Sequence, residues 1–551
     1  MSRKRVNAVV IGAGAAGGVV AKELAEGGLS VVLLERGQWT TNYDCRKDDL
    51  RNQRTSVLGH PFGPDDERNP RVIVDTNGES AVVKPSEPGY QNNAACVGSG
   101  TVSYGAMAWR YMEQDFRMRS IYGAVPGSTL DDWPITYHDL EPYYEKAERE
   151  IGVSGEVTND PFKAPRVNPL PMPPLAGNRE CELLRAAAGR LGWHPFDVPM
   201  FRNSVPRQGR QQCMRCRWCV GHSCEVNAKN GTQNTVIPTA LATGNCELRT
   251  GCHVRRILTD ARGRAAGVEY YDDRDRLQEQ PADLVVVSGA AIESARLLML
   301  SAGKMYPAGI GNRYDWVGRN LQGHSYPRVA GLFKEVIYDD LGPGSGVAVC
   351  DFSHGNKALT GGAMITGDFL RSPYQFVEKT PRWAPRWGIE HKRFMREAYR
   401  FHASVGGPVQ EMPTWDSRVQ LDPKVKDYWG LPVARISGQK HPHVVEIAKF
   451  IVGKCEMWLK EAGAYKTWAS LPNLAVSGGQ HQAGTCRMGN DPKTSVVNRY
   501  CQVHEADNLF VIDGSVHPNN GGFNPALTIM AVAYYASANI VKTWKGTGFR
   551  S

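Results

Sequence analysis

The chain has 551 residues, of which 41% are apolar and 22% charged, and its formal net charge is +9. This length exceeds the roughly 250–300 residues at which one hydrophobic core stops growing, so two or more domains are expected. Basic and acidic residues are interspersed and no apolar run approaches the roughly 18 residues of a membrane span, so the composition argues against nucleic-acid binding and against a membrane span.

We expect no export signal in the N-terminal residues. The opening MSRKRVNAVVIGAG passes directly from a few basic residues into a β-branched run, without a signal-type apolar stretch or a cleavage site. The 13 cysteines are odd in number and sparse for this length, which is typical of a reducing compartment. We therefore expect a soluble, cytoplasmic protein, and export together with a partner subunit stays open.

Residues 6–36 read VNAVVIGAGAAGGVVAKELAEGGLSVVLLER and predict a strand, a glycine-rich turn, a helix and a second strand. Gly12 permits the tight turn, Gly14 lets the backbone approach a pyrophosphate, and Gly17 lets helix and strand pack closely. Glu35 lies where a carboxylate accepts hydrogen bonds from an adenosine ribose. The pattern predicts a dinucleotide site, but it does not distinguish FAD from NAD.

Two later stretches depart from the alternation of strands and helices. Residues 156–215 are rich in proline, arginine and asparagine, which predicts irregular cover. Between about 331 and 474, tryptophans, prolines and short strand-like runs such as VAGLFKEVIY predict an inserted α+β region. The chain should therefore combine a parallel α/β part with an α+β part.

Several separated segments resemble the glucose–methanol–choline (GMC) family of flavin oxidoreductases. Besides the fingerprint, these segments are residues 92–116 (NNAACVGSGTVSYGAMAWRYMEQDF), 132–155, 282–303, 317–324 (VGRNLQGH) and 508–540. The resemblance implies a Rossmann-like FAD-binding domain built from discontinuous segments, and an α+β substrate domain with a sheet over the flavin. It implies these boundaries: the FAD-binding domain at 1–155, 225–330 and 475–551, and the substrate-binding or cap domain at 156–224 and 331–474.

Three stretches are more similar to the sugar-oxidising branch of the family than to its other branches. They are residues 97–116, the stretch WCVGHSCEVNAKNGTQNT and the NPALTI ending. This branch contains pyranose oxidases and bacterial glycoside 3-oxidases and 3-dehydrogenases. The resemblance therefore implies oxidation of a secondary ring hydroxyl of a sugar or glycoside, at C3 or C2, to a ketone.

A histidine and an asparagine match the family's active-site pair. Oxidation of an alcohol by hydride transfer needs a base on the hydroxyl, and a neutral imidazole suits that role near neutral pH. By the family's pattern the base is His481, and Asn524 orients the same oxygen. Asn524 precedes Pro525, which suits the first position of a helix. The apolar run from 525 to about 543 predicts a buried helix there.

Other residues are weaker candidates for the pocket. Three histidines are rivals of the catalytic pair, namely His517, His324 and His222. Three tryptophans could stack on a sugar ring, namely Trp383, Trp387 and Trp415.

The resemblance also implies a set of cofactor-binding residues. Asp513 follows a predicted strand, where a carboxylate can bond the ribityl or phosphate part of FAD, although an Asp-Gly turn is the alternative. The full set is Gly12, Gly14, Ala15, Ala16, Gly17, Glu35, Arg36, Val97, Gly98, Gly100, Thr101, Ser103, Tyr104, Gly105, Val254, Asp513, Gly514, Asn524, Pro525 and Thr528.

Ser103 departs from the family's pattern. Several sugar-oxidising relatives have at the matching position a histidine that is covalently joined to the flavin. Serine cannot form that bond, so we expect non-covalent FAD, with Tyr104 and the backbone of residues 98–105 packed against the ring.

The stretch CMRCRWCVGHSC contains four clustered cysteines. Its spacing approaches that of ferredoxin-type iron–sulfur sites, and dehydrogenase relatives hold a cluster here, but the last interval is one residue too long. A zinc site and reduced thiols in a packed loop are the alternatives. We favour reduced thiols and no metal; the candidate iron–sulfur ligands are Cys213, Cys216, Cys219 and Cys224.

The sequence thus predicts an FAD-dependent oxidoreductase acting on a small sugar or glycoside. Dioxygen, a quinone or a partner redox subunit would accept the electrons. Three alternatives stay open: a primary-alcohol oxidase of an aminoglycoside-type pathway, a dehydrogenase subunit that passes electrons through an iron–sulfur cluster, and a non-redox FAD-containing lyase.

Overall fold

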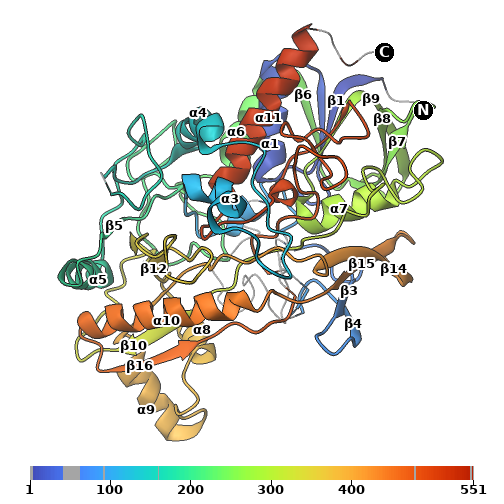
Figure 1. The fold of residues 1–551 in the computed structure, drawn as a ribbon. Coiled ribbons are helices and arrows are strands. Elements are labelled where there is room, and N and C mark those ends of the chain that lie inside the picture. The colour runs from blue at the N-terminus through green and yellow to red at the C-terminus, as the bar shows by residue number, and fades with distance from the viewer. Residues whose placement is uncertain are drawn as a thin grey trace.

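The computed structural model describes residues 4–40, 63–87, 89–90, 94–158, 160–476, 479–546 and 549. Residues 92 and 93, which begin one of the family-like segments, lie outside the described residues. The described chain forms an upper part with a mostly parallel sheet and a lower part with a second, antiparallel sheet (Figure 1). This arrangement confirms the predicted fold class, an α/β FAD-type domain joined to an α+β domain.

Five strands form the parallel part of the upper sheet. β1 lies in its centre, where Val9 pairs with Val32 on one side and with Val285 on the other. All three valines are buried because helices or loops cover both faces of a parallel sheet, which explains the continuous aliphatic runs in the sequence. In spatial order the strands are β6 Cys246–Arg249, β2 Val31–Leu34, β1 Val6–Ile11, β9 Leu277–Val287 and β17 Leu509–Val511.

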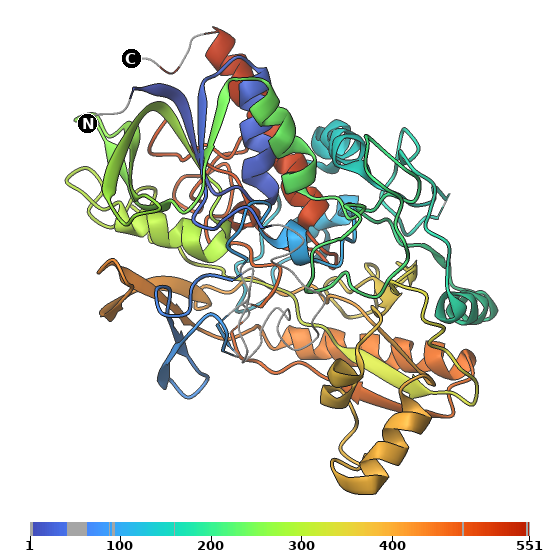
Figure 2. The same cartoon turned by 180° about the vertical axis from the view of Figure 1, so that it is seen from behind.

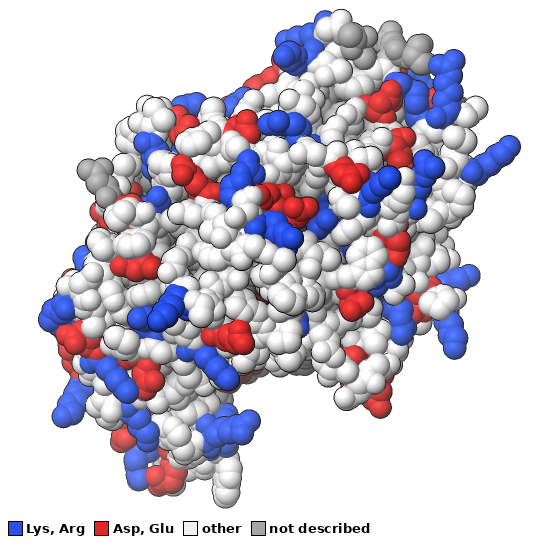
Figure 3. Space-filling view, viewed as in Figure 1, with Lys and Arg blue, Asp and Glu red and all other residues white. Residues whose placement is uncertain are grey.

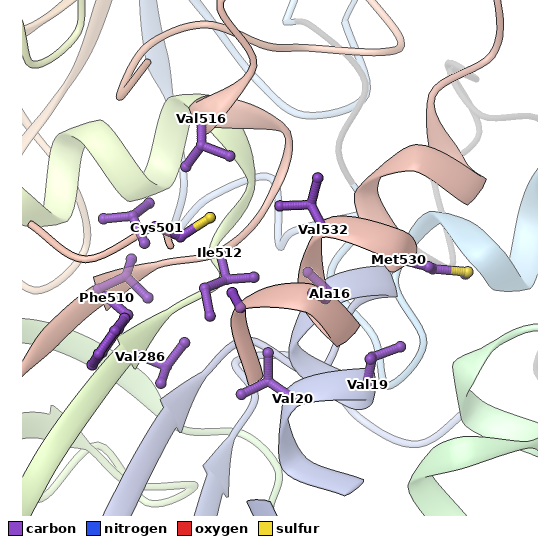
Figure 4. Packing of buried hydrophobic residues seen from close by; sticks show 14 of the residues in the cluster. Ala16, Val19, Val20, Val286, Cys501, Phe510, Ile512, Val516, Met530 and Val532 are labelled. Atoms are coloured by element: carbon purple, nitrogen blue, oxygen red, sulfur yellow. The ribbon is translucent and has the colours of Figure 1, made fainter. Parts of the chain in front are cut away.

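Helices from the two ends of the chain cover this sheet. α1 (Ala15–Glu26) packs against α6 (Val236–Ala242) and α11 (Ala526–Gly546), and the three helices lie side by side in Figure 2. Figure 4 shows Val19 and Val20 of α1 near Val532 of α11, all in one buried cluster. α11 is the buried helix predicted from residue 525 onward, and it fixes the C-terminal segment against the N-terminal fingerprint.

Two further strands and two helices complete the upper part. β7 and β8 extend β9 as an antiparallel meander. Thr136 caps α4 by accepting a hydrogen bond from Asp139 N, and α4 packs against α11. The bounds are β7 His253–Thr259, β8 Ala265–Tyr271, α4 Tyr137–Ala147 and α7 Ala290–Leu300.

The lower part is built on a six-stranded antiparallel sheet. α10 (His443–Glu461) and α5 (Arg179–Arg190) pack against it and enclose a second hydrophobic core that contains Trp458 and Val405. In spatial order the strands are β16 Lys466–Ser470, β10 Arg328–Leu332, β13 His402–Gly406, β12 Ile365–Gly367, β11 Val347–Val349 and β5 Phe196–Asp197.

A third sheet joins segments that are distant in the sequence. β15 pairs in parallel with β3, with Ile436 opposite Ile73, so a strand from the N-terminal quarter pairs with one from the inserted region. The sequence did not indicate this contact. The strands are β14 Arg418–Lys426, β15 Pro432–Ser437, β3 Arg71–Val74 and β4 Ser80–Val83.

The remaining helices are short and lie mostly in connections. They are α2 Gly100–Ser103, η1 Glu113–Arg117, α3 Met118–Tyr122, η2 Glu148–Gly152, η3 Thr232–Asn234, α8 Pro373–Glu378, α9 Gly388–Ala398 and η4 Gly514–Val516. Of all helices within the described ranges, none combines the length and the apolar character that crossing a bilayer requires. Basic and acidic side chains are intermixed over the face shown in Figure 3.

The glycine turn yields a test of the upper part. A Cβ added to Gly17 would lie 1.8 Å from Gly12 O, so helix α1 and the turn would have to separate. We expect Gly17→Ala to lower the free energy of unfolding by about 1–3 kcal/mol and to reduce bound FAD. Thermal unfolding and flavin absorbance measure both.

Gly453→Ala is the matched control. Gly453 lies within α10, and a Cβ added there would meet nothing within 4 Å. Since alanine favours a helix interior by about 1 kcal/mol over glycine, this variant should be at least as stable as the parent. Equal melting temperatures for Gly17→Ala and the parent protein would contradict the packing described for the turn.

Candidate active site

A cavity of about 530 Å³ lies between the carboxyl ends of the parallel strands and the antiparallel sheet. The carboxyl edge is where ligands bind in open α/β sheets. The predicted residues that line the cavity are Gly12, Gly14, Ala15, Ala16, Glu35, Arg36, Gly100, Thr101, Ser103, Tyr104, Gly105, Val254, His481, Asp513, Gly514, Asn524 and Pro525.

Four predicted cofactor positions lie outside this lining: Gly17, Val97, Gly98 and Thr528. Gly17 gives room to the glycine turn, and Gly98 N donates to Ala13 O at 2.8 Å. The hydroxyl of Thr528 lies 2.8 Å from Tyr144 Oη within the core.

The glycine turn opens the start of α1 toward the cavity. Gly12 has φ +99°, and a Cβ there would lie 2.4 Å from Ser288 O. Gly14 is the N-cap of α1, without a side-chain cap, and the first turn holds no acidic residue. The first N–H groups of a helix have no partner within the helix, and together with the helix dipole they form an anion site.

Two buried carboxylates line the same end of the cavity. Glu35 accepts hydrogen bonds from Ala13 N at 2.8 Å and Gly37 N at 2.9 Å, and burial raises the pKa of its carboxyl group. Asp513 accepts from Ser294 Oγ at 2.6 Å and from Ser515 N at 2.8 Å, so its carboxylate is fixed by the protein itself. Burial also raises the pKa of Asp513.

His481 and Asn524 meet in this cavity although 43 positions separate them. His481 Nε2 lies 3.5 Å from Asn524 Nδ2. His481 has φ +67°, a left-handed conformation that is uncommon outside glycine and that accumulates at functional sites. Asn524 Oδ1 is buried and has no hydrogen-bond partner among the described residues.

Hydrogen bonds to His324 fix the tautomer of His481. His324 Nε2 lies 2.9 Å from Gly521 O and 3.1 Å from Asn520 O, so this nitrogen must carry a hydrogen. Burial lowers the pKa of His324, which keeps the ring neutral and leaves a lone pair on Nδ1. His481 Nδ1 lies 2.9 Å from His324 Nδ1 and therefore donates its hydrogen to that nitrogen. In neutral His481 the ring lone pair is thus on Nε2, the nitrogen that faces Asn524 Nδ2 at 3.5 Å.

Tyr326 and Asn520 hold this arrangement in place. Tyr326 Oη lies 3.1 Å from His481 Nδ1 and accepts from Asn524 Nδ2 at 3.3 Å. Asn520 Nδ2 donates to His481 O at 2.7 Å, and Tyr111 Oη donates to Asn520 O at 2.6 Å. Neither Tyr326 nor Asn520 was predicted from the sequence. The only signal was the spacing of His324 and Tyr326, because residues two apart in an extended segment share a face.

The rival candidates lie elsewhere or act differently. His517 is fully buried between Trp133 and Tyr111 and is not part of the cavity lining; burial lowers its pKa to about 3. His222 lines the cavity. Among the described lining residues, none of the three candidate tryptophans occurs: Trp383, Trp387 and Trp415.

The four clustered cysteines line a separate, small cavity of about 20 Å³. Burial raises the pKa of the Cys213 thiol. Within the ranges that the structure describes, no group of three or more His, Cys, Asp or Glu side chains is arranged to hold a metal ion.

The residues present fit FAD. The open N-terminus of α1 suits a pyrophosphate, and Glu35 offers carboxylate oxygens to ribose hydroxyls. At the other end, the unpartnered Asn524 Oδ1 and the N-terminus of α11 border the cavity next to His481.

Comparisons with known proteins agree with this geometry. Models of the GMC oxidoreductase family match residues 126–326 and 413–533. The gluconate 2-dehydrogenase flavoprotein of Pantoea cypripedii is 30% identical over 98% of this chain and 94% of its own length. The chain belongs to the GMC oxidoreductase family. Like other GMC oxidoreductases it is an FAD-dependent enzyme that acts on CH–OH groups.

Two further relatives extend the comparison of this GMC oxidoreductase. Paromamine 6'-oxidase of Streptomyces fradiae is 31% identical over 95% of this chain and 89% of its own length. The crystal structure of pyridoxine 4-oxidase from Mesorbium loti covers 97% of this chain and 98% of its own, with a TM-score of 0.64 and 18% identity. This structural likeness supports the fold.

The role of His324 can be tested with two variants. His324→Ala removes the acceptor at Nδ1, so His481 can adopt the other tautomer, and we expect flavin reduction to slow by about 100-fold. In His324→Asn the amide oxygen can replace Nδ1 as acceptor, so part of the rate should return. Rapid-mixing absorbance of the flavin without oxygen measures each rate.

His138→Ala is the control, since the side chain of His138 is 75% exposed and far from this hydrogen-bond network. It should reduce flavin at the parent rate. A parent-like rate in His324→Ala would show that His324 does not set the tautomer of His481.

Proposed function

We propose that this enzyme oxidises a secondary ring hydroxyl of a sugar or glycoside, at C3 or C2, to a ketone. The observation that carries the proposal is the 3.5 Å approach of His481 Nε2 to Asn524 Nδ2 inside the cavity that also contains the glycine turn. The similarity to the gluconate dehydrogenase flavoprotein supports a sugar-derived substrate.

His481 acts as the base in this proposal. Its Nε2 lone pair takes the hydroxyl proton, while the amide of Asn524 bonds the same oxygen and orients the carbon. The new imidazolium keeps its Nδ1–H bond to His324 at 2.9 Å, and this neutral acceptor stabilises the positive charge. Bound FAD would supply the hydride acceptor for this oxidation.

The N-terminus of α11 contributes electrostatically. Pro525 and Ala526 line the cavity, so the positive end of the helix dipole lies at the site. Such a dipole end favours negative charge and would stabilise the reduced, anionic cofactor.

Oxidation of a primary alcohol is the second candidate. The identity of 31% to paromamine 6'-oxidase over 95% of this chain favours it. The two candidates give different products, because a secondary hydroxyl yields a ketone and a primary hydroxyl yields an aldehyde. NMR of the product from one turnover distinguishes them.

The base is tested by removing its imidazole. We expect His481→Ala to keep FAD, because no part of the nucleotide end of the cavity changes, and to lose about 10²–10⁴-fold in the rate of flavin reduction by substrate. FAD content by absorbance and reduction rate by rapid mixing are the two readouts. A rate within a few-fold of the parent would remove His481 as the base.

Acid precipitation tests the mode of FAD attachment. Ser103 lines the cavity at the position where several relatives have a flavin-linked histidine, and a serine hydroxyl cannot form that histidyl bond. After precipitation the flavin should remain in the supernatant. Yellow colour in the washed pellet would contradict the non-covalent attachment that we propose.

A further inference from the structure

Three charged side chains line the cavity at its antiparallel-sheet end. Arg328 begins β10, Asp368 directly follows β12, and Arg371 comes three residues later. Asp368 forms an ion pair with both arginines, and both guanidinium groups contact the same oxygen, Oδ2. The other oxygen, Oδ1, accepts from Phe369 N at 2.9 Å.

This cluster carries an excess positive charge. The two arginines hold the pKa of Asp368 far below its usual range, although burial opposes them, so the carboxylate is ionised and balances one guanidinium. Two other titratable groups are close. Burial raises the pKa of Glu180 to about 8, and burial lowers the pKa of His402 to about 4. At pH 7 Glu180 is mostly protonated and His402 is neutral, so neither compensates the second guanidinium.

The two arginines also have N–H groups that Asp368 does not use. A guanidinium has five N–H groups, and the described residues provide Arg328 and Arg371 with no acceptor other than Asp368. The side chains are partly accessible, with exposed fractions of 28% for Arg328 and 21% for Arg371, and both border the cavity. A planar guanidinium group matches the geometry of a carboxylate, which it can bind through two parallel hydrogen bonds.

Tyr326 contacts both this cluster and His481 of the proposed catalytic pair. The guanidinium carbon of Arg328 is 5.4 Å from the centre of the Tyr326 ring, and Tyr326 Oη is 3.1 Å from His481 Nδ1. Tyr326 lies two residues before Arg328, the first residue of β10, and the Arg328 guanidinium lies over its ring. Tyr326 Oη also accepts from Asn524 Nδ2 at 3.3 Å, so Tyr326 contacts both Arg328 and the amide that faces His481 Nε2.

We infer that the substrate carries a carboxylate that Arg328 and Arg371 bind while His481 deprotonates a hydroxyl of the same molecule. The substrate class is thus an acidic sugar, a uronate or an aldonate. This inference rests on the proposed function and narrows it. Asp368 positions the two arginines and, by repelling a carboxylate that is not seated between them, orients the substrate.

Matched pairs of sugars provide the kinetic test. Methyl glucuronide, galacturonide and mannuronide are each mixed with the FAD-loaded enzyme without oxygen, beside the corresponding neutral methyl glycosides; gluconate is paired with glucitol. Since a hydrogen bond to a charged group contributes up to about 100-fold, we expect at least one acid to reduce the flavin about 10–100-fold more efficiently than its neutral partner.

Variants assign that preference to the arginines. Arg328→Gln and Arg371→Gln should lose most of the preference for the acid, measured in each variant as the ratio of the reduction rate with the acid to that with its neutral partner. Arg393→Gln is the control, because Arg393 on α9 is 58% exposed and pairs with Glu390 on the surface. It should behave as the parent protein does.

A binding measurement keeps the test independent of turnover. Tetrahydropyran-2-carboxylate and its carboxamide have the same shape, and neither has a hydroxyl to oxidise. The shift of the flavin band on titration should give a dissociation constant at least tenfold lower for the carboxylate, and Arg328→Gln should abolish the difference.

The outcomes separate the two proposals. If neutral sugars reduce the flavin as well as acids, and the carboxylate binds no more tightly than the amide, the acidic substrate is wrong while sugar oxidation stands. If no sugar of either kind reduces the flavin, the proposed function is wrong and the inference falls with it.

Discussion

The proposed active site depends on one hydrogen bond between His481 and His324, and burial keeps the His324 ring neutral by lowering its pKa. His481 Nδ1 donates to His324 Nδ1 at 2.9 Å, and this direction is forced because the other nitrogen of His324 already donates to two backbone carbonyls. The lone pair of His481 is consequently exposed on the side of Asn524. A base that is already in the correct tautomer needs no rearrangement before it takes a proton, which is the sense in which the site is preorganised.

The fold brings three distant segments to this bond. Residues 320–328 enter from the connection to β10, residues 479–484 cross from the C-terminal segment, and residues 519–524 lead into α11. Asn520 connects these segments. Its Nδ2 donates to Gly323 O and to His481 O, and its backbone oxygen accepts from His324 Nε2. The parallel sheet supplies the cofactor end of the same cavity. The proposed reaction would therefore take place between the upper and lower parts of the molecule, whose arrangement Figure 1 shows.

Local patterns sufficed to predict the cofactor end and the buried helix α11. The glycine fingerprint can be recognised in the sequence because the contact that requires it is between residues close along the chain. A Cβ on Gly17 would lie 1.8 Å from Gly12 O, so residue 17 must be glycine. His481 and Asn524 were predicted through their family motifs, and the structure brings them together. Which sugar carbon reacts is a question that local patterns do not address.

The residues whose role the sequence did not show share a different physical origin. His324, 157 positions from His481, acts through a contact that no periodicity encodes, and its sequence signal is that of an ordinary buried histidine. The ion pairs of Asp368 with Arg328 and Arg371 likewise depend on how β10 and β12 lie in one sheet, and β3 pairs with β15 across more than half of the chain. Long-range pairing of this kind is determined by the packing of whole layers and not by a local preference.

Neutron diffraction from crystals of the FAD-bound enzyme tests the central claim most directly, because it locates the hydrogen on each imidazole nitrogen. Our account predicts hydrogen on Nδ1 of His481 and on Nε2 of His324, with none on Nε2 of His481. A hydrogen on Nε2 of His481 in the resting enzyme, or a His481 ring turned away from Asn524, would contradict it.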